Sequence, residues 1–172
     1  NKNPKFRKKR KLGQWYYEQQ MLGFNYRMND IEASLGISQI DKLKSFLKKR
    51  NKIANRYQLN LKSLPIQTQT ISPKSISTYH LFIIMLPNKK RIKENYNKIF
   101  KFFLKNKIGV NLHYLPVHLH PVYKRIGFKK GDFPNSETYS KRAFSIPIFH
   151  QMSDKEHNRI IKIIKKICSK FM

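Results

Sequence analysis

The chain has 172 residues, of which 40% are hydrophobic, and it carries 37 Lys and Arg residues against 9 Asp and Glu residues. This apolar content excludes a disordered chain, and the longest apolar run, residues 81–86, is far too short to cross a bilayer. A single cysteine, Cys168, excludes an internal disulfide and a thiolate-rich zinc site. We therefore expect a soluble protein of the cytoplasm.

The formal net charge of +28 has two explanations. A sustained positive potential attracts polyanions such as nucleic acid, and the dense basic run Lys2–Lys11 is typical of nucleic-acid-binding arms. Lys, Asn and Ile are, however, abundant together, as an AT-rich genome would produce, and most lysines are spread along the chain. Compositional drift is the simpler explanation, and a basic nucleic-acid-binding module stays as an alternative function.

The first clear helical signal begins at Asn29. Residues 1–28 show no period, and we interpret them as an irregular basic arm followed by a loop. Asn29 and Glu32 have the spacing of a capping box, and the apolar residues that follow predict one long helix over residues 29–64, ended by Pro65. Its expected inner face consists of Ile31, Leu35, Leu43, Phe46, Leu47, Ile53, Ala54, Tyr57 and Leu61.

Residues 65–172 mix strand-like and helical segments. The expected order begins with a loop over 65–75, a strand over 77–86, a helix capped by Asn88 and closed at Gly109, and a strand over 110–115. Turns at Pro116 and Pro121 and a loop over 127–135 follow. The chain then continues with a helix from Ser136 to Phe144, an edge strand over 145–147 and a last helix opened by the capping box Ser153–Glu156. The isoleucines of that last helix should face inward. This order predicts an α/β protein in which a long helix leads into a small α+β domain, a small sheet with helices on one side.

Three histidines lie close together in the segment 111–120. His113, His118 and His120 could ligate zinc with one position left for water. Strand alternation, however, places His118 and His120 on one side, Pro116 breaks the geometry towards His113, and no carboxylate follows within ten residues to orient a ring. We therefore favour the end of a strand that faces a substrate, where a histidine donates a hydrogen bond, over a metal site.

The segment 22–30 places an amide, a phenol and a guanidinium directly before the capped helix start. Arg27 offers a planar fork for phosphate, and helix N-terminal amides add partial positive charge, so the segment suits anion recognition. The alternative is structural, with Tyr26 and Met28 packed and Asn25 in a turn.

No catalytic residues are expected in this chain. There is no Gly-x-Ser-x-Gly elbow, no Gly-rich phosphate loop and no obvious pair of carboxylates among the 9 acidic residues. Cys168 lies among isoleucines and is interpreted as an inert small hydrophobe.

Longer motifs point to a known family. The chain carries Trp15-Tyr-Tyr-Glu18, Leu22-Gly-Phe-Asn-Tyr-Arg-Met28, Tyr79-His-Leu-Phe82, Gly109-Val-Asn-Leu-His-Tyr114, Pro116-Val-His-Leu119, Gly131-Asp-Phe-Pro134 and Ser145-Ile-Pro-Ile-Phe149. In this order they resemble the DegT/DnrJ/EryC1/StrS sugar aminotransferases, over nearly the whole chain. The resemblance is strongest to the pseudaminic acid branch, the UDP-4-amino-4,6-dideoxy-N-acetyl-β-L-altrosamine transaminases. His150 departs from the pattern, since relatives usually carry Pro there.

The resemblance implies the C-terminal part of a fold-type I transferase that depends on pyridoxal 5'-phosphate (PLP). Such enzymes move an amino group, normally from glutamate, to the 4-keto carbon of a UDP-linked hexulose, and they are homodimers with active sites at the interface. The family's cofactor lysine lies in a Ser-x-His-x-x-Lys context of the large N-terminal domain, and no lysine here has that context. Because the chain also starts at Asn1, we expect it to be the C-terminal portion, to need the upstream domain and to be inactive alone.

The resemblance also assigns roles to single residues. Asn25 matches the asparagine that reaches across the dimer to the PLP phosphate, and Arg27 is a further candidate for cofactor or substrate phosphate. His113 and Tyr114 match a pair that faces the nucleotide-sugar from the neighbouring subunit. Tyr26 and His118 are additional candidates for substrate binding. Besides the nucleic-acid module, a purely structural dimerisation domain is the remaining alternative.

Overall fold

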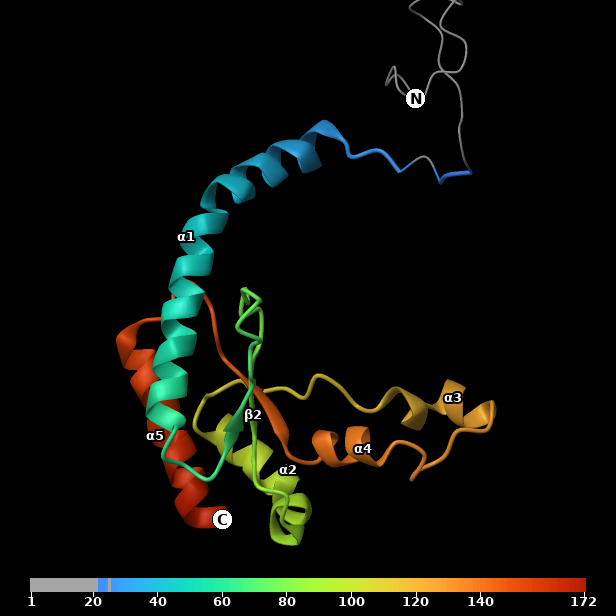
Figure 1. Ribbon diagram of the computed structural model, residues 1–172, viewed down its shortest axis with the longest axis vertical. Coiled ribbons are helices and arrows are strands. Elements are labelled where there is room, and N and C mark those ends of the chain that lie inside the picture. The colour runs from blue at the N-terminus through green and yellow to red at the C-terminus, as the bar shows by residue number, and fades with distance from the viewer. Residues whose placement is uncertain (1–21, 25) are drawn as a thin grey trace, which may run out of the picture. The chain divides into compact units, whose positions relative to one another are not determined.

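The computed structural model describes residues 22–24 and 26–172 (Figure 1). The chain divides into two units, residues 1–41 and 42–172, and the long helix α1 contributes to both. The elements are α1 (Asp30–Leu61), β1 (Gln67–Thr68), β2 (Phe82–Met85), α2 (Lys90–Lys105), the 3-10 turn η3 (Val117–Leu119), α3 (Pro121–Arg125), α4 (Pro134–Ser140), β3 (Ala143–Ile146) and α5 (Asp154–Phe171). None of the helices within the described ranges is both long and apolar enough to cross a membrane.

The start of α1 is capped as the sequence predicts. The Glu32 N–H donates to Asn29 Oδ1 at 2.8 Å, and the Asn29 N–H donates to Glu32 Oε2 at 3.2 Å. These reciprocal bonds satisfy two amides that the helix itself leaves free. The predicted long helix is therefore confirmed, but it ends at Leu61 and not at residue 64, before Pro65 is reached.

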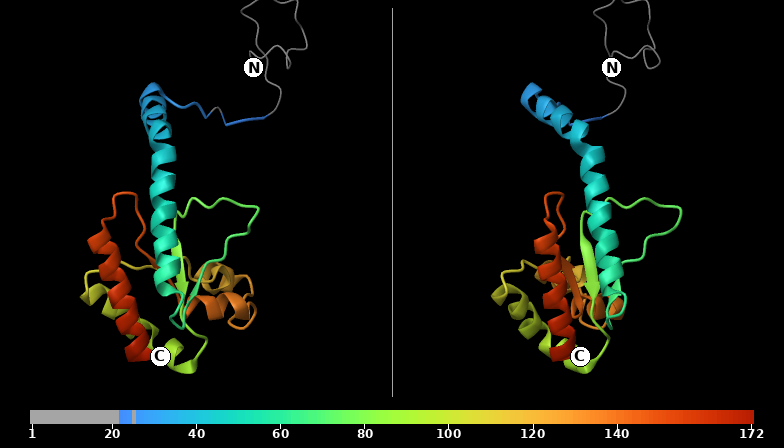
Figure 2. Two further views of the ribbon diagram at one scale, coloured as in Figure 1. Left: turned by 60° about the vertical axis from the view of Figure 1, so that its left-hand side comes forward. Right: turned by 90° about the vertical axis from the view of Figure 1, so that its left-hand side faces the viewer.

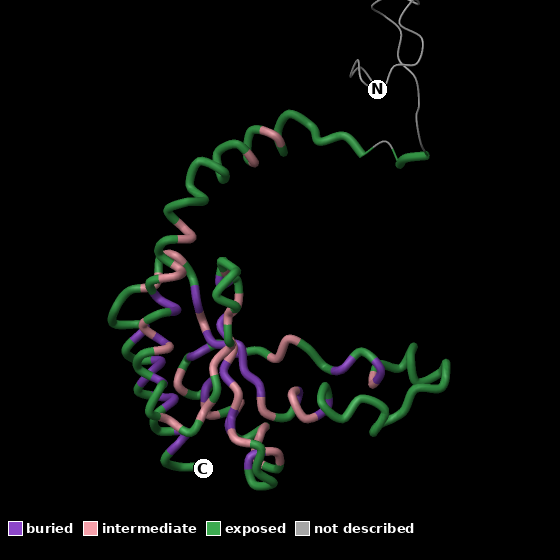
Figure 3. The backbone as a smooth tube through the Cα atoms, in the orientation of Figure 1, coloured by how far each residue is buried: buried purple, intermediate pink, exposed green. Residues whose placement is uncertain are grey.

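The predicted inner face of α1 is only half right. The buried residues of the helix are Ile53, Ala54, Tyr57 and Leu61. Ile31 and Leu35 are 81% and 61% exposed in this chain, although they follow the same period. Figure 3 shows the same change from exposed to buried along the helix. Periodicity finds the apolar stripe, but it does not say which part of the stripe this chain covers.

The sheet has three antiparallel strands in the order β1-β2-β3. In its register Phe82 pairs with Ile146 and Ile84 pairs with Phe144, so these four side chains share one face. Ser145 pairs with Ile83, and their side chains lie on the opposite face.

Three helices cover the Phe82 face. Tyr57 of α1 packs on Phe82 with ring centroids 5.0 Å apart, and Phe103 of α2 packs on Phe144 at 5.6 Å. His157 of α5 packs on Tyr57 at 4.2 Å. Figure 2 shows α5 and the C-terminal half of α1 beside the sheet, with α3 and α4 on the other side. A small sheet with its main helices on one side is confirmed.

The strand predicted over residues 77–86 is shorter than expected. β2 begins only at Phe82, because side chains of α1 take the preceding carbonyl groups. Arg50 donates to the Tyr79 and His80 carbonyls at 2.9 and 3.2 Å, and Asn51 donates to the Ser77 carbonyl. The segment is thus tied to the helix instead of pairing as a strand.

Four further features differ from the sequence prediction. The cap of α2 is Lys89, without a side-chain bond, so Asn88 is not its cap. Residues 110–115 form no strand, and only Asn111 makes an isolated bridge, to Ser145. α4 begins at Pro134 instead of Ser136, because proline suits the first helical turn, and β3 correspondingly begins at Ala143.

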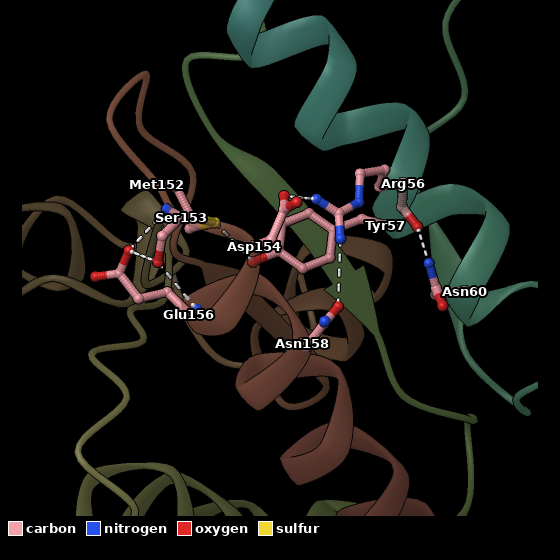
Figure 4. A network of polar contacts seen from close by, with 8 residues as sticks. All are labelled: Arg56, Tyr57, Asn60, Met152, Ser153, Asp154, Glu156 and Asn158. Atoms are coloured by element: carbon pink, nitrogen blue, oxygen red, sulfur yellow. Dashed lines mark hydrogen bonds and ion pairs between the residues drawn. The ribbon is translucent and has the colours of Figure 1, made fainter.

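The last helix follows the prediction closely. Ser153 and Glu156 form a full capping box, drawn in Figure 4, and the buried residues include Ile160, Ile161, Ile163, Ile164 and Ile167. Arg56 of α1 pairs with Asp154 and donates to Asn158, which ties α5 to α1 (Figure 4). Cys168 is buried, and burial raises the pKa of its thiol, in agreement with an inert core residue.

Candidate functional site

His113 is held against the sheet face opposite the helices. Asn111 and Ser145 exchange two backbone hydrogen bonds, of 3.2 and 2.7 Å, which attach the segment before His113 to β3. His113 Nδ1 lies 2.8 Å from Ser145 Oγ. The Tyr139 hydroxyl of α4 donates to the His113 carbonyl at 3.3 Å. Ring and backbone of this histidine are therefore positioned by two different elements.

Tyr114 lies beside His113 at the surface. Its ring meets the imidazole edge-on with centroids 4.7 Å apart, and the side chain is 72% exposed. An exposed phenol next to a positioned imidazole gives two polar groups that can contact a ligand together. The structure thus places the side chains of His113 and Tyr114 against each other.

His118 lies in a different environment. Its side chain is only 6% exposed, and Nε2 donates to Glu137 Oε1 at 2.9 Å. The same oxygen accepts the Gly131 N–H at 2.6 Å. These bonds favour a structural role for His118, which joins η3, α4 and the loop between them. Little of the imidazole surface remains exposed for contact with a ligand.

Glu137 is the residue that sequence reasoning missed. The search for an orienting carboxylate stopped ten residues beyond the histidines, whereas Glu137 lies 19 residues after His118. The Gly131 N–H and then the His118 ring hold the pKa of Glu137 below its usual value. The one sequence signal that could have identified Glu137 is its position shortly after the motif Gly131-Asp-Phe-Pro134.

An apolar hollow of about 300 Å³ opens beside His118. Its walls are Val117, His118, Tyr123, Phe128, Phe133 and Ser136. Several of these side chains are partly exposed, among them Phe133 at 48%. The hollow therefore offers aromatic surface close to the segment that carries His113 and Tyr114.

The candidates before α1 belong to the first unit. Arg27 and Tyr26 are exposed, whereas Asn25 lies outside the described residues. The first turn of α1 contains Asp30 and Glu32, and the Asn29 side chain already accepts a helix amide. The helix terminus is thus supplied with negative groups, so Arg27 is the group here that suits an added phosphate.

Only part of a PLP site fits the described residues. The exposed Arg27 guanidinium matches the phosphate end of the cofactor by its charge and planar donors. A lysine that carries PLP is usually taken out of bulk water, and no lysine in the described ranges is buried. The described residues therefore fit the phosphate group of PLP, and they include no buried lysine that could bind the cofactor covalently.

The zinc alternative receives no support. Within residues 22–24 and 26–172, no group of three or more His, Cys, Asp or Glu side chains could hold a metal ion. His118 is engaged by Glu137, His113 by Ser145, and His120 is exposed.

Solved structures that superpose on this chain include proteins described as aminotransferases. The sugar aminotransferase Spr1654 of Streptococcus pneumoniae, described as putative, superposes with a TM-score of 0.80 at 29% identity, over 94% of this chain and 40% of that one. It has been solved in PLP and PMP forms as well. Helicobacter pylori PseC, an aminotransferase of pseudoaminic acid biosynthesis, gives 0.78 at 22% identity, over 91% of this chain and 42% of that one, and shows the fold alone.

The family model of the DegT/DnrJ/EryC1/StrS aminotransferases matches residues 5–165, and the chain belongs to this family. Among curated relatives, MJ1066 of Methanocaldococcus jannaschii is 38% identical over 159 residues, 91% of this chain and 41% of the relative. The spore coat polysaccharide biosynthesis protein SpsC of Bacillus subtilis is 34% identical over 167 residues, 90% of this chain and 40% of the relative. The chain thus spans about two fifths of the length of these relatives.

These comparisons confirm the predicted family and fold class, and the PLP and PMP forms agree with the predicted cofactor. None of these proteins is described as binding nucleic acid, so the alternative of a nucleic-acid-binding module gains no support. The basic run Lys2–Lys11 on which that alternative depends lies outside the described residues.

Proposed function

We propose that the chain is the C-terminal portion of a PLP-dependent nucleotide-sugar aminotransferase. The reaction moves an amino group from glutamate to the 4-keto carbon of a UDP-linked 4-keto-6-deoxyhexose. The observation that carries the proposal is the family match over residues 5–165, which includes every segment placed in the candidate site. Surface-sugar synthesis agrees with the description of SpsC as a polysaccharide biosynthesis protein.

Within this family we favour a substrate of the pseudaminic acid type. The support comes from the motifs Phe24–Met28, His113–His118 and Gly131–Pro134 of the sequence. PseC adds the fold at 22% identity and does not decide the sugar.

Residues of this chain divide into two groups in the proposed enzyme. His113 and Tyr114 contact the nucleotide-sugar, supported by the exposed phenol and the positioned imidazole. Arg27 and Asn25 contact the phosphate of PLP in the partner subunit of a homodimer, and Tyr26 adds to the substrate side. PLP, when bound, supplies the carrier for the amino group and the electron-withdrawing ring. His118 stabilises the segment that follows His113 and Tyr114 through its hydrogen bond to Glu137.

The proposal includes dependence on a large domain outside this chain. The chain alone should neither retain PLP nor transfer an amino group, because no described lysine is placed to bind the cofactor covalently. We expect the assembled enzyme to act in the cytoplasm, where nucleotide-sugars are made.

A chimera tests the proposal directly. The part of Spr1654 that this chain covers, 40% of its length, is replaced by residues 1–172. The purified chimera should show PLP absorbance and convert UDP-4-keto-6-deoxyhexose to the amino sugar only with glutamate, as followed by product mass. The chain alone and the remaining Spr1654 part alone are the controls. A folded chimera that binds no PLP contradicts the proposed class, and one that binds PLP but aminates no UDP-keto-sugar contradicts the substrate.

A further inference from the structure

The Ser145 hydroxyl has a single partner in the described part of the chain. Ser145 is 7% exposed, and its Oγ lies 2.8 Å from His113 Nδ1. The backbone N–H and carbonyl of Ser145 are both hydrogen-bonded, because they exchange two hydrogen bonds with Asn111. The other ring nitrogen of His113, Nε2, makes no hydrogen bond to any described residue and is not enclosed, since the buried unpartnered atoms are those of Arg142 and His157.

Two proton arrangements can satisfy the contact between Ser145 and His113. In the first, the hydroxyl donates to Nδ1, which leaves the proton of the neutral ring on Nε2. In the second, Nδ1–H donates to Oγ, and the hydroxyl proton then needs another acceptor. No described residue offers that acceptor, and a buried unpaired hydroxyl donor destabilises the folded state. The first arrangement is therefore favoured.

We infer that Ser145 is a positioning residue that holds His113 in the tautomer with the proton on Nε2, so that His113 presents a hydrogen-bond donor to the ligand. The chemistry that this donor recognises is an oxygen acceptor, either a sugar hydroxyl or carbonyl oxygen or a phosphate oxygen. The part that concerns the ligand rests on the proposed function. The tautomer itself follows from the contacts of β3 with residues 111–113 and does not depend on it.

The geometry around His113 supports a fixed orientation of the ring. The Tyr139 hydroxyl holds the His113 carbonyl at 3.3 Å, and the Tyr114 ring meets the imidazole at 4.7 Å. The His113 carbonyl, its Nδ1 and its ring are thus each in contact with a different group. Nε2 is the ring nitrogen without a partner among the described residues, so a fixed tautomer decides whether it offers a donor or an acceptor.

Nitrogen NMR of the histidine rings tests the tautomer on the full chain at neutral to alkaline pH. The ¹⁵N shifts of His113 should show a protonated Nε2 and an unprotonated Nδ1. In Ser145→Ala both shifts should move towards the averaged values of a ring that exchanges between tautomers. A wild-type ring protonated on Nδ1, or shifts that Ser145→Ala leaves unchanged, would overturn the inference.

Two variants separate positioning from general stability. Ser145→Thr keeps a hydroxyl on a β-branched residue that suits a strand, and the wild-type shifts should return. Ser140→Ala removes an equally buried hydroxyl, which donates to the Glu137 carbonyl at 2.8 Å, and should leave the His113 shifts unchanged. If Ser145→Ala does not fold, the protonation of the wild-type ring still decides between the two arrangements.

The chimera described above separates this inference from the proposed function. Ser145→Ala should raise the KM for the UDP-keto-sugar by about fivefold and change kcat by less than about twofold, as expected for loss of one oriented hydrogen bond. An inactive chimera would contradict the proposed function and leave the NMR result to decide the tautomer. An active chimera whose KM is unaffected by Ser145→Ala would contradict the donor role of His113.

Discussion

Glu137 accepts hydrogen bonds from His118 Nε2 at 2.9 Å and from the Gly131 N–H at 2.6 Å, both on the same carboxylate oxygen. The two donors lie in η3 and in the loop before α4, so one side chain joins three segments. The Gly131 N–H, followed by the His118 ring, lowers the pKa of this carboxyl below its ordinary 4.5. The contact also explains why His118 and Glu137 are buried although both are polar.

This relationship predicts a pH-dependent stability. A folded-state pKa below 4.5 means that the contribution of Glu137 is fully present above pH 4.5 and is lost as the pH falls through the folded-state pKa. Glu137→Gln removes the charge, so its unfolding free energy should lie below that of the wild type at pH 7 and approach it in acid. Urea unfolding from about pH 3 to 7 measures both curves.

Glu94→Gln is the control for Glu137. Glu94 lies 3.9 Å from Lys90 in an exposed pair on α2, and its loss should change stability by less than about 0.5 kcal/mol. The capping residue Glu156 also has a lowered pKa, but it is present in both the wild type and Glu137→Gln, so its contribution cancels in their difference. Parallel pH curves for the wild type and Glu137→Gln would contradict the assigned role.

His157 predicts a second pH effect, at higher pH. The ring is 1% exposed and packs on Tyr57. Neither nitrogen makes a well-formed hydrogen bond to a described residue, although the Asn158 side chain and the Ile53 backbone lie near enough to favour the charged ring slightly. Burial, followed by the charge of Arg56, lowers its pKa below the ordinary 6.5, so the folded state favours the neutral ring. The contribution of neutral His157 to the free energy of unfolding is present above pH 6.5 and is lost as the pH falls through the folded-state pKa.

His157→Phe should therefore flatten the loss of stability below pH 6.5. At neutral pH the variant should be as stable as the wild type or more stable by about 1 kcal/mol, because it removes two buried nitrogens that lack a well-formed hydrogen bond and keeps the ring packing on Tyr57. Thermal unfolding at a series of pH values measures this. His120→Asn, at an exposed position, should keep the wild-type slope, and an equally steep His157→Phe curve would refute the explanation.

The capping box of α5 predicts a local loss of stability. Ser153 Oγ accepts the Glu156 N–H at 3.2 Å, and the Ser153 N–H donates to Glu156 Oε2 at 2.8 Å. Ser153→Ala should lower the unfolding free energy by about 1 kcal/mol. Ser169→Ala removes a hydroxyl that bonds only to Lys166 within the same helix and should cost clearly less. Equal effects of the two substitutions in denaturant unfolding would contradict the importance of the cap.

The capping boxes also show which parts of the fold a sequence reveals. Asn29–Glu32 and Ser153–Glu156 are read from residues three positions apart, so the starts of α1 and α5 could be predicted. β1 could not, because its two residues, Gln67 and Thr68, become a strand only by pairing with Met85 and Ile84. Local spacing carries the helix signal, whereas a two-residue strand exists only in the folded sheet.

The same difference applies to the candidate site. His113 and Tyr114 are adjacent, and their proximity needed no folded structure. The partners Ser145 and Glu137 lie 32 and 19 residues from the histidines that they contact. The Glu137 contact depends on the loop turning at Gly131, whose φ of +101° favours glycine. Such a turn brings the carboxylate back to His118, which no spacing rule along the chain describes.

The resemblance to PLP enzymes predicts that Asn25 and Arg27 hold the cofactor phosphate. In the chimera with Spr1654, Asn25→Ala and Arg27→Ala should each weaken PLP retention by about tenfold, since a hydrogen bond to a charged phosphate is lost. Arg27→Lys should lose less, because it keeps the charge but not the planar pair of donors. Release of PLP on dialysis, followed by absorbance, measures retention. Arg125→Ala, on the exposed helix α3, controls for the loss of one positive charge. Unchanged retention in Asn25→Ala would remove Asn25 from the cofactor site, and the same result for Arg27→Ala would leave its guanidinium to the substrate.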